Sequence, residues 1–229
     1  MNADLSRHPR LVEFVRLKYN HGDPSHDFNH VKRVVASCIR LGTPLGANLR
    51  RLIPAALLHD VIHVPKNSPN RLEASALASE EAKIILKGFA DEIALTDDDM
   101  QAIATIILEH SYSLGKKPTS LESAILQDAD KLDGLGALGI ARTFACCAVM
   151  GGAFYDSASP FPAEFDASGS RALDDKLFCV DHFYTKLFKL SGLMNTEAGR
   201  QEAETRAAFM QLYLEQFQNE LDFGSTTQA

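Results

Sequence analysis

Residues 47–62 read ANLRRLIPAALLHDVI, and this stretch decides the fold. Its second half is apolar almost throughout, up to a histidine-aspartate doublet at His59 and Asp60. A helix that is apolar on all sides lies in the centre of a protein. We therefore expect a central buried helix from Ala47 to about Ile62. Near its end, an imidazole and a carboxylate lie beside the core.

The sequence on either side of this stretch has helical periodicity. Gly42, Pro44 and Gly46 are expected to end the preceding helix, and Thr96 is expected to cap a later one. Residues 151–170 are rich in Gly, Pro, Ser and Asp and predict a long excursion. No repeat or strand is indicated, so the predicted fold class is all-α. The other expected helices span about residues 11–19, 27–41, 71–89, 97–109, 121–132, 134–149, 173–190 and 196–221.

The chain has 229 residues, of which 45% are hydrophobic and 23% charged, and this is ordinary for a globular protein. We expect a single domain over residues 1–223 and a disordered tail over 224–229. The formal net charge of −7 disfavours binding to nucleic acid and to anionic membranes. No signal peptide or membrane-spanning segment is apparent, which predicts a cytoplasmic protein. We expect either a monomer or a homodimer. The cysteines have no metal-type spacing and are expected to be free thiols: Cys38, Cys146, Cys147 and Cys179.

Four residues near helix ends or on buried faces combine into a possible metal site: His30, His59, Asp60 and Asp130. Taken alone, His30 also fits a capping or surface histidine, and Asp130 fits a carboxylate on a helix surface. The doublet is harder to explain in that way, because buried charge is unfavourable unless it is paired or bound to a metal. Two imidazoles and two carboxylates would neutralise a divalent cation and leave open positions for water.

This ordered set resembles the HD superfamily of metal-dependent phosphohydrolases. The similarity includes longer segments and covers about residues 8–220, with an HD core over about 25–135 and C-terminal helices, packed on it, over 136–223. Some of these segments resemble one bacterial subfamily of small stand-alone HD hydrolases. The segments are HDFNHVKRV at 26–34, LLHD at 57–60, EHSYS at 109–113, ILQDADKLD at 125–133, GIARTF at 139–144, LDDK at 173–176 and HFYTKL at 182–187.

The resemblance implies a metal-dependent enzyme that hydrolyses nucleotides, with release of pyrophosphate from nucleoside triphosphates favoured. Alternatives are a 5′-nucleotidase or another phosphomonoesterase or phosphodiesterase, a hydrolase of a signalling nucleotide or non-nucleotide ester, and a sensor module with little turnover. The ligand set suits one divalent ion: Mn²⁺, Mg²⁺, Co²⁺, Ni²⁺ or Fe²⁺.

Binuclear members of the superfamily place two more histidines between the doublet and the last aspartate, where this chain has only His63 and His110. His63 does not match the usual position, and we interpret it as a pocket-wall or surface residue, so a mononuclear site is expected. Asp60 is expected to be catalytic as well as a ligand. His110 could orient the substrate or act as a general acid, and Asp133 could orient water.

An acidic protein needs local cations to hold an anionic substrate such as a phosphate ester. Basic and amide side chains follow or flank the motif segments, although a solvated surface charge is the commoner reading of any one of them. The predicted substrate-binding residues are Lys66, Asn67, Arg71, Lys131 and Arg142.

Overall fold

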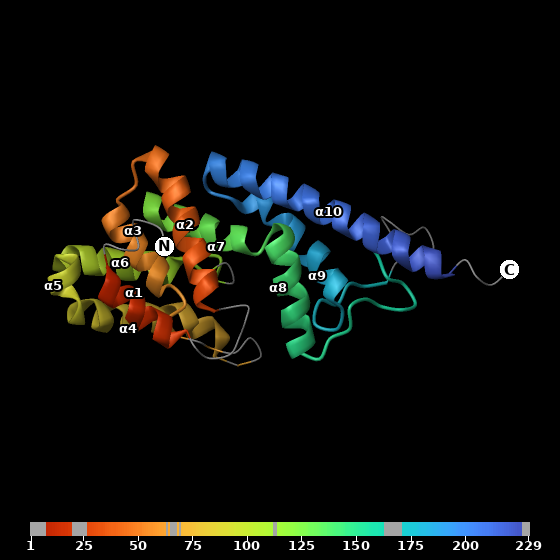
Figure 1. Ribbon diagram of the computed structural model, residues 1–229, viewed down its shortest axis with the longest axis horizontal. Helices are drawn as coiled ribbons and strands as arrows, with labels where there is room; N and C mark the ends of the chain where they lie inside the picture. Colours follow the sequence, from red (N-terminus) through yellow and green to blue (C-terminus); the bar gives the residue numbers. More distant parts are fainter. Residues whose placement is uncertain are drawn as a thin grey trace. The chain divides into compact units, whose positions relative to one another are not determined.

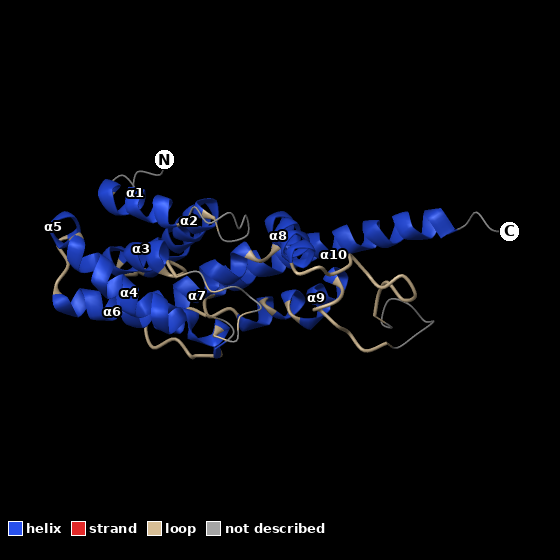
Figure 2. Ribbon diagram, turned by 90° about the horizontal axis from the view of Figure 1, so that it is seen from below, coloured by secondary structure: helices blue, strands red, loops and turns tan. Residues whose placement is uncertain are grey.

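The computed structural model describes residues 8–19, 27–62, 64, 68, 70–111, 114–162 and 171–225. Within these residues every regular element is a helix, and the only β-type pairing is an isolated bridge between Ala153 and Phe178 (Figure 2). The predicted all-α class is confirmed. The chain divides into two compact units, which we call the N-terminal unit (Met1–Lys131) and the C-terminal unit (Leu132–Ala229).

The boundary between the units falls inside a helix, whereas we expected the HD core to end near residue 135. That the chain forms one functional domain over residues 1–223 stays a prediction. The N-terminal unit contains α1 (Pro9–Lys18), α2 (Phe28–Leu45), α3 (Leu49–Leu58), η2 (Arg71–Glu73), α4 (Ala74–Gly88), α5 (Ala90–Ile93), α6 (Asp97–Glu109) and all but the last two residues of α7 (Leu121–Asp133).

Helix α3 is the central helix of the N-terminal unit, as its sequence predicts (Figure 1). It packs against α1, α2 and α6, and its residues 52–58 are all buried. It ends at Leu58, four residues before the expected end. The Ala56 carbonyl accepts from the His59 ring, and the Asp60 N–H donates to the Tyr19 hydroxyl instead of continuing the helix.

Helix α2 continues through Gly42 and Pro44, so the expected break near Leu41 is wrong. Gly42 serves close packing, because a Cβ there would lie 3.1 Å from a methyl carbon of Leu52. The helix ends at Leu45, and the next residue, Gly46, caps it with a left-handed φ of +69°. At α6 the expected Thr96 cap is confirmed as part of a capping box with Asp99.

The C-terminal unit is built around its long last helix. It contains α8 (Gly136–Val149), α9 (Cys179–Thr185), η4 (Leu187–Lys189), η5 (Ser191–Leu193) and α10 (Glu197–Ser225). Helix α8 and η5 pack on α10, and α9 lies beside α8 and η4 (Figure 1). Aromatic rings fill the space between these helices, with Phe144 in contact with Phe183, Tyr213 and Phe217.

The expected helix over 173–190 is wrong, because α9 covers only its middle and 3-10 turns follow. Side chains satisfy the backbone before α9: the Asp174 carboxylate accepts the N–H groups of Lys176 and Leu177, and the Asp174 N–H donates to buried Asp181. The bidentate ion pair of Arg171 with Asp181 holds this loop in place.

Two further expectations concern the ends of helices in this unit. Helix α8 begins at Gly136, two residues after the expected start, because the chain makes a close turn there, in which a Cβ on Gly139 would overlap the Gly134 carbonyl oxygen. Helix α10 includes Gly224 and Ser225, whereas we expected the tail to start at residue 224, and residues 226–229 lie outside the described residues.

All four cysteines are free thiols. Among the described residues no single helix has the length and apolarity to cross a membrane, and only the bent pair of α7 with α8 meets that test, by length and composition alone.

Candidate metal centre

The four predicted metal ligands come from three helix ends of the N-terminal unit. His30 is the third residue of α2, where the Asp27 carboxylate caps the helix by accepting the His30 N–H. His59 and Asp60 follow the last residue of α3, and Asp130 lies in the last turn of α7. Helix ends fix the direction in which the next side chain leaves, so the three helices determine where these groups point.

The ligating atoms of these residues converge. His30 Nε2 lies 3.2 Å from His59 Nε2 and 3.6 Å from Asp130 Oδ1. His59 Nε2 lies 3.9 Å from Asp130 Oδ1 and 3.9 Å from Asp60 Oδ2. Both imidazoles are fully buried, whereas the Asp60 and Asp130 side chains keep 20% and 28% of their surface exposed. The cluster is therefore reachable from solvent through its carboxylates.

The tautomer of His59 follows from its hydrogen bond. Its Nδ1 lies 2.8 Å from the Ala56 carbonyl oxygen, which can only accept a hydrogen bond. Nδ1 therefore carries the proton, and in the neutral ring Nε2 presents a lone pair to His30 and to the carboxylates. A main-chain carbonyl on the outer nitrogen is a usual way to orient a metal-binding imidazole.

The separations fit a shared divalent ion. Ligand atoms about 2.1 Å from one ion lie about 3.0 to 4.2 Å from each other, depending on whether they are neighbours or opposite. The nitrogen and oxygen separations above fall in this interval. His30, His59 and Asp60 form a group that could hold a metal, with ligating atoms all within 4.8 Å of one another. Mixed nitrogen and oxygen donors match the metals expected from the sequence.

His110 lies against this group, although it is not among the predicted ligands. It follows the last residue of α6, its Nδ1 lies 2.6 Å from the Ile107 carbonyl, and its Nε2 lies 3.4 Å from Asp60 Oδ1. Burial opposes protonation of His110, but the hydrogen bond and charge of Asp60 outweigh it and raise its pKa. Because Nδ1 donates to the Ile107 carbonyl, Nε2 can donate to Asp60 only when the His110 ring is protonated, and the raised pKa favours that form.

The pKa values of His59 and Asp130 are both lowered, which favours the forms of these side chains that bind a cation. Burial lowers the pKa of His59, which favours its neutral, metal-binding form. Burial tends to raise the pKa of Asp130, but the charges of His59 and His30 outweigh it and lower the pKa. A deprotonated Asp130 carboxylate and a neutral His59 imidazole are the forms in which these two side chains bind a divalent ion.

Sequence reasoning missed Tyr19 as a residue of this site. Its hydroxyl accepts the Asp60 N–H at 3.2 Å and is almost fully buried, whereas the sequence predicts only that residue 19 ends a helix. Burial raises the pKa of Tyr19 well above its usual value, and the Asp60 charge adds to that shift. The signal was present in principle, because a buried tyrosine hydroxyl needs a hydrogen-bond partner.

Residues 116–119, which precede α7, are held by Glu109 and Gln127, for which the sequence predicts no such role. The Glu109 carboxylate accepts the Thr119 N–H and hydroxyl at 3.0 and 2.8 Å. The Gln127 amide donates to the main-chain oxygens of Glu109 and Lys116. These bonds connect the helix end that carries His110 to the helix that carries Asp130.

The predicted substrate-binding residues are only partly described. His63, Lys66 and Asn67 lie outside the described residues, and of Arg71 only the backbone, in η2, is described. Lys131 is buried, with its Nζ 3.5 Å from Gln127 Oε1 and 3.9 Å from Asp128 Oδ1, and burial lowers its pKa. A phosphate would have to draw the Lys131 ammonium away from these partners.

Two predicted residues of the C-terminal unit are partners of each other. Arg142 Nη1 donates to Asp133 Oδ2 at 2.5 Å, and the Asp133 side chain is almost fully buried. The sequence predicts catalysis for Asp133 and phosphate binding for Arg142 separately, and no sequence pattern indicates that they pair. Those two roles stay predictions, and each would compete with this ion pair.

Comparison with known proteins shows the same arrangement of helices elsewhere. The family profile of the HD domain matches residues 27–135. The uncharacterized protein YpgQ of Bacillus subtilis (strain 168) is 31% identical over 196 residues, which are 86% of this chain and 84% of YpgQ. His30, His59, Asp60 and Asp130 all lie within the residues that the HD profile matches.

Three solved structures are similar over nearly the whole chain. A Lactobacillus plantarum protein has a TM-score of 0.70 at 32% identity, covering 97% of this chain and 98% of its own. An HD-superfamily hydrolase of Bacillus thuringiensis has 0.69 at 30%, covering 96% and 98%. YpgQ in complex with ADP has 0.68 at 26%, covering 95% and 96%. On the profile match and these relatives, the chain belongs to the HD superfamily.

Proposed function

We propose that this chain is a metal-dependent phosphohydrolase that acts on nucleotides, and that it converts nucleoside triphosphates into monophosphates with release of pyrophosphate. One divalent ion would be held by His30, His59, Asp60 and Asp130. The observation that carries the proposal is the convergence of these donors, with the His59 lone pair directed inward by the Ala56 carbonyl.

The donor chemistry supports hydrolysis. When bound, a divalent ion lowers the pKa of a coordinated water and neutralises charge on phosphate oxygens. Two carboxylates and two neutral imidazoles balance the charge of such an ion and leave room for other ligands. The partial exposure of Asp60 and Asp130 provides an approach from solvent.

The residues around the ion site would position a phosphate group. His110 presents its Nε2 to Asp60 and would hydrogen-bond either that carboxylate or a phosphate oxygen of the substrate. Lys131, three residues from Asp128 on the same helix, would contribute charge if a phosphate draws it from Gln127. Phosphoryl transfer depends mainly on positioning and charge neutralisation, and these groups supply both.

The choice of a nucleotide as substrate rests on a relative. YpgQ has been solved in complex with ADP, which carries a base, a sugar and a diphosphate. A relative of similar sequence and fold that takes a nucleoside diphosphate favours the same class of ligand here. Preference for a triphosphate over a monophosphate is the finer part of the proposal.

Hydrolysis in ¹⁸O-labelled water tests the bond that is cleaved. The protein would be incubated with dATP or GTP and Mn²⁺, and the products would be separated and weighed by mass spectrometry. Label in the nucleoside monophosphate, with pyrophosphate as the other product, means attack at the α-phosphorus and supports the proposal. Label in orthophosphate, or turnover of monophosphates only, overturns pyrophosphate release and favours a nucleotidase or another phosphoesterase.

A parallel assay tests the dependence on metal. EDTA should abolish turnover, and Mn²⁺, Mg²⁺, Co²⁺ or Ni²⁺ should restore it to different degrees. Turnover that persists after exhaustive chelation contradicts the metal-dependent mechanism. Stoichiometric nucleotide binding with no turnover under any metal favours a sensor module instead.

A further inference from the structure

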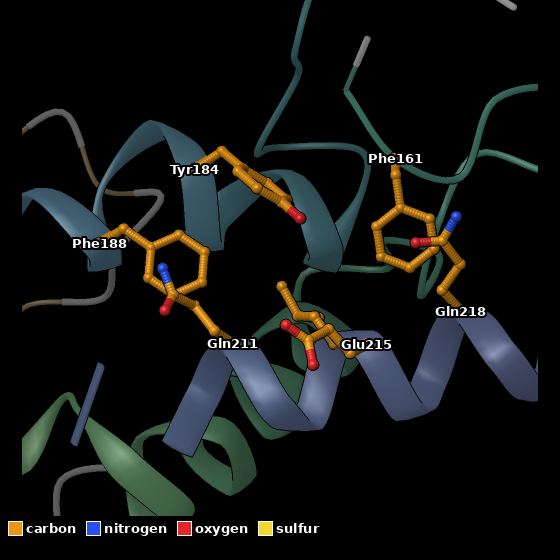
Figure 3. Close-up of a pocket in the computed structure, with 7 residues that line it drawn as sticks. Phe161, Tyr184, Phe188, Gln211, Glu215 and Gln218 are labelled. Atoms are coloured by element: carbon orange, nitrogen blue, oxygen red, sulfur yellow. The ribbon is translucent and has the colours of Figure 1, made fainter. Parts of the chain in front are cut away.

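A second concave site lies wholly within the C-terminal unit. It has a volume of about 190 Å³ and lies between α10, the segment of α9 and η4, and the loop before residue 162 (Figure 3). The described residues that line it are Phe161, Tyr184, Phe188, Gln211, Leu214, Glu215 and Gln218. None of the predicted metal ligands belongs to it.

The aromatic side of this site consists of three rings. Tyr184 and Phe188 face α10 from above, at a ring separation of 5.4 Å and an interplanar angle of 70°, and Phe161 lies at the other end (Figure 3). Phe161 and Leu214 are each 3% exposed and form the apolar part of the lining. The site therefore offers ring faces and edges set at large angles to each other, unlike a flat apolar patch.

The polar side of the site comes from one face of α10. Gln211, Glu215 and Gln218 follow the i, i+4, i+7 spacing, with the Gln211 amide near Phe188, the Gln218 amide near Phe161 and the Glu215 carboxylate between them (Figure 3). None of the three side chains makes a hydrogen bond or ion pair with another residue of the described ranges. Their two amides and one carboxylate are thus available to a ligand.

The charge of the lining decides between classes of ligand. Glu215 is the only charged residue among the described lining residues, so a phosphate or carboxylate ligand would be repelled. Aromatic rings, amide oxygens and a carboxylate all attract cations. The net charge of −7 adds a favourable long-range field for a cation.

We propose that this pocket between α10 and α9 is a binding site for a small organic cation with an ammonium or guanidinium head and an apolar stem. The head lies at Glu215 with Gln211 and Gln218 beside it, and the stem packs among Phe161, Tyr184 and Phe188. This site is separate from the nucleotide hydrolysis proposed above and does not depend on it.

Binding of phenethylamine to the full chain tests the assignment. Phenethylamine is protonated near neutral pH, and 2-phenylethanol supplies a neutral molecule of the same shape. Chemical-shift titration of the ¹⁵N-labelled protein should show saturable shifts in α9 and α10 for the amine, and clearly weaker binding of the alcohol. Glu215→Gln should weaken amine binding about fivefold, the scale of an exposed charge pair. Glu204→Gln, an exposed glutamate of the same helix outside the pocket, should leave it unchanged.

Four results overturn the proposal. Phenethylamine fails to shift pocket resonances, or the alcohol binds as tightly as the amine. Glu215→Gln and Glu204→Gln have the same effect, which reduces the charge contribution to a general field. Adenosine binds in the pocket while phenethylamine does not, which means that the site binds a planar nucleobase and not a cation. Thermal melting of Glu215→Gln and Glu204→Gln checks that each variant is folded. Phe188→Leu should weaken binding of the amine more than binding of the alcohol.

Discussion

Histidine and carboxylate side chains meet in both units, and the two arrangements differ in what holds the ring. In the N-terminal unit, His59 and His110 donate from Nδ1 to main-chain carbonyls three residues earlier, and their Nε2 atoms face Asp60. In the C-terminal unit, His182 Nδ1 lies 3.2 Å from the Asp175 carboxylate, which also accepts the Thr185 hydroxyl at 2.8 Å.

The difference shows how a carboxylate is kept available for an ion. Where a helix carbonyl orients the ring, the carboxylate does not have to do so and can face a shared centre. Where the carboxylate orients the ring, one of its oxygens is engaged, because His182 and Thr185 both bond Asp175 Oδ2. Burial opposes ionisation of Asp175, but these two bonds outweigh it and lower its pKa. We expect the first arrangement to bind metal and the second to be structural.

The largest predicted effect is the difference in turnover between variants of Asp60 and Asp175. Asp60→Ala should lower pyrophosphate release by about a thousandfold or more, because the ion and its charge stabilisation are lost. Asp175→Ala should stay within a few-fold of the parent. Initial rates measured with Mn²⁺ and a triphosphate, with circular dichroism of each variant, give the comparison. Equal losses in the two folded variants contradict the distinction between the arrangements.

Metal content should separate His59 from His182. His59→Gln should bind Mn²⁺ at least about a hundredfold more weakly, because a metal ligand is removed. His182→Gln should keep the parent affinity. Equilibrium dialysis with elemental analysis measures both, and circular dichroism checks the folding of the buried variant. Undiminished Mn²⁺ binding by a folded His59→Gln protein would rule His59 out as a ligand.

A third carboxylate, Asp99, should contribute to the stability of the fold and not to turnover. Asp99 closes the α6 capping box and accepts Arg51 Nε at 2.8 Å. The Arg51 bond, aided by Thr96 and Arg50, lowers its pKa from 3.8 to about 2. Asp99→Asn should therefore reduce the free energy of unfolding by about 1–2 kcal/mol at neutral pH, with turnover unchanged.

The pH dependence of that difference has a definite sign. Because the folded pKa of Asp99 is depressed, its stabilisation is fully present above about 3.8 and is lost as the pH falls toward and through about 2. Urea unfolding of parent and Asp99→Asn should therefore converge between about pH 4 and pH 2. A difference that stays constant over this interval would show that the ionised carboxylate is not its source.

The smallest effect should come from Thr185. Thr185→Val removes the hydroxyl that bonds Asp175 and should reduce the free energy of unfolding by about 0.5 kcal/mol, the scale of one partly exposed hydrogen bond. Urea unfolding measures it, and the ¹⁵N shifts of His182 report whether the ring is reoriented. A loss of metal binding in Thr185→Val would mean that the arrangement we regard as structural contributes to the ion site.

Local signals made much of this fold predictable. The central α3, the Thr96 cap of α6 and the all-α class follow from periodicity and capping within a few residues of sequence. Expectations were wrong where contacts from elsewhere decided the outcome. Gly42 continues α2 because Leu52 packs against it, and Asp174 replaces a helical turn by bonding the backbone with its side chain.

In the candidate site too, the residues in local motifs were predictable and the contacts between distant residues were not. The sequence marked His30, His59 and Asp60, which form a group able to hold a metal. It did not reveal that Tyr19 bonds the Asp60 N–H across 41 positions of sequence. The ion pair of Asp133 with Arg142 could not be predicted either, because the sequence does not indicate which basic residue an aspartate contacts.

The Nδ1 bonds of His59 and His110 bear on how this chain can diverge. Each ring is oriented by a carbonyl three residues before it, Ala56 for one and Ile107 for the other. The orientation therefore depends on where α3 and α6 end rather than on which apolar side chains pack around them. Substitutions throughout the core can accumulate by drift while the donor geometry persists, as long as those two helices stop at the same residues.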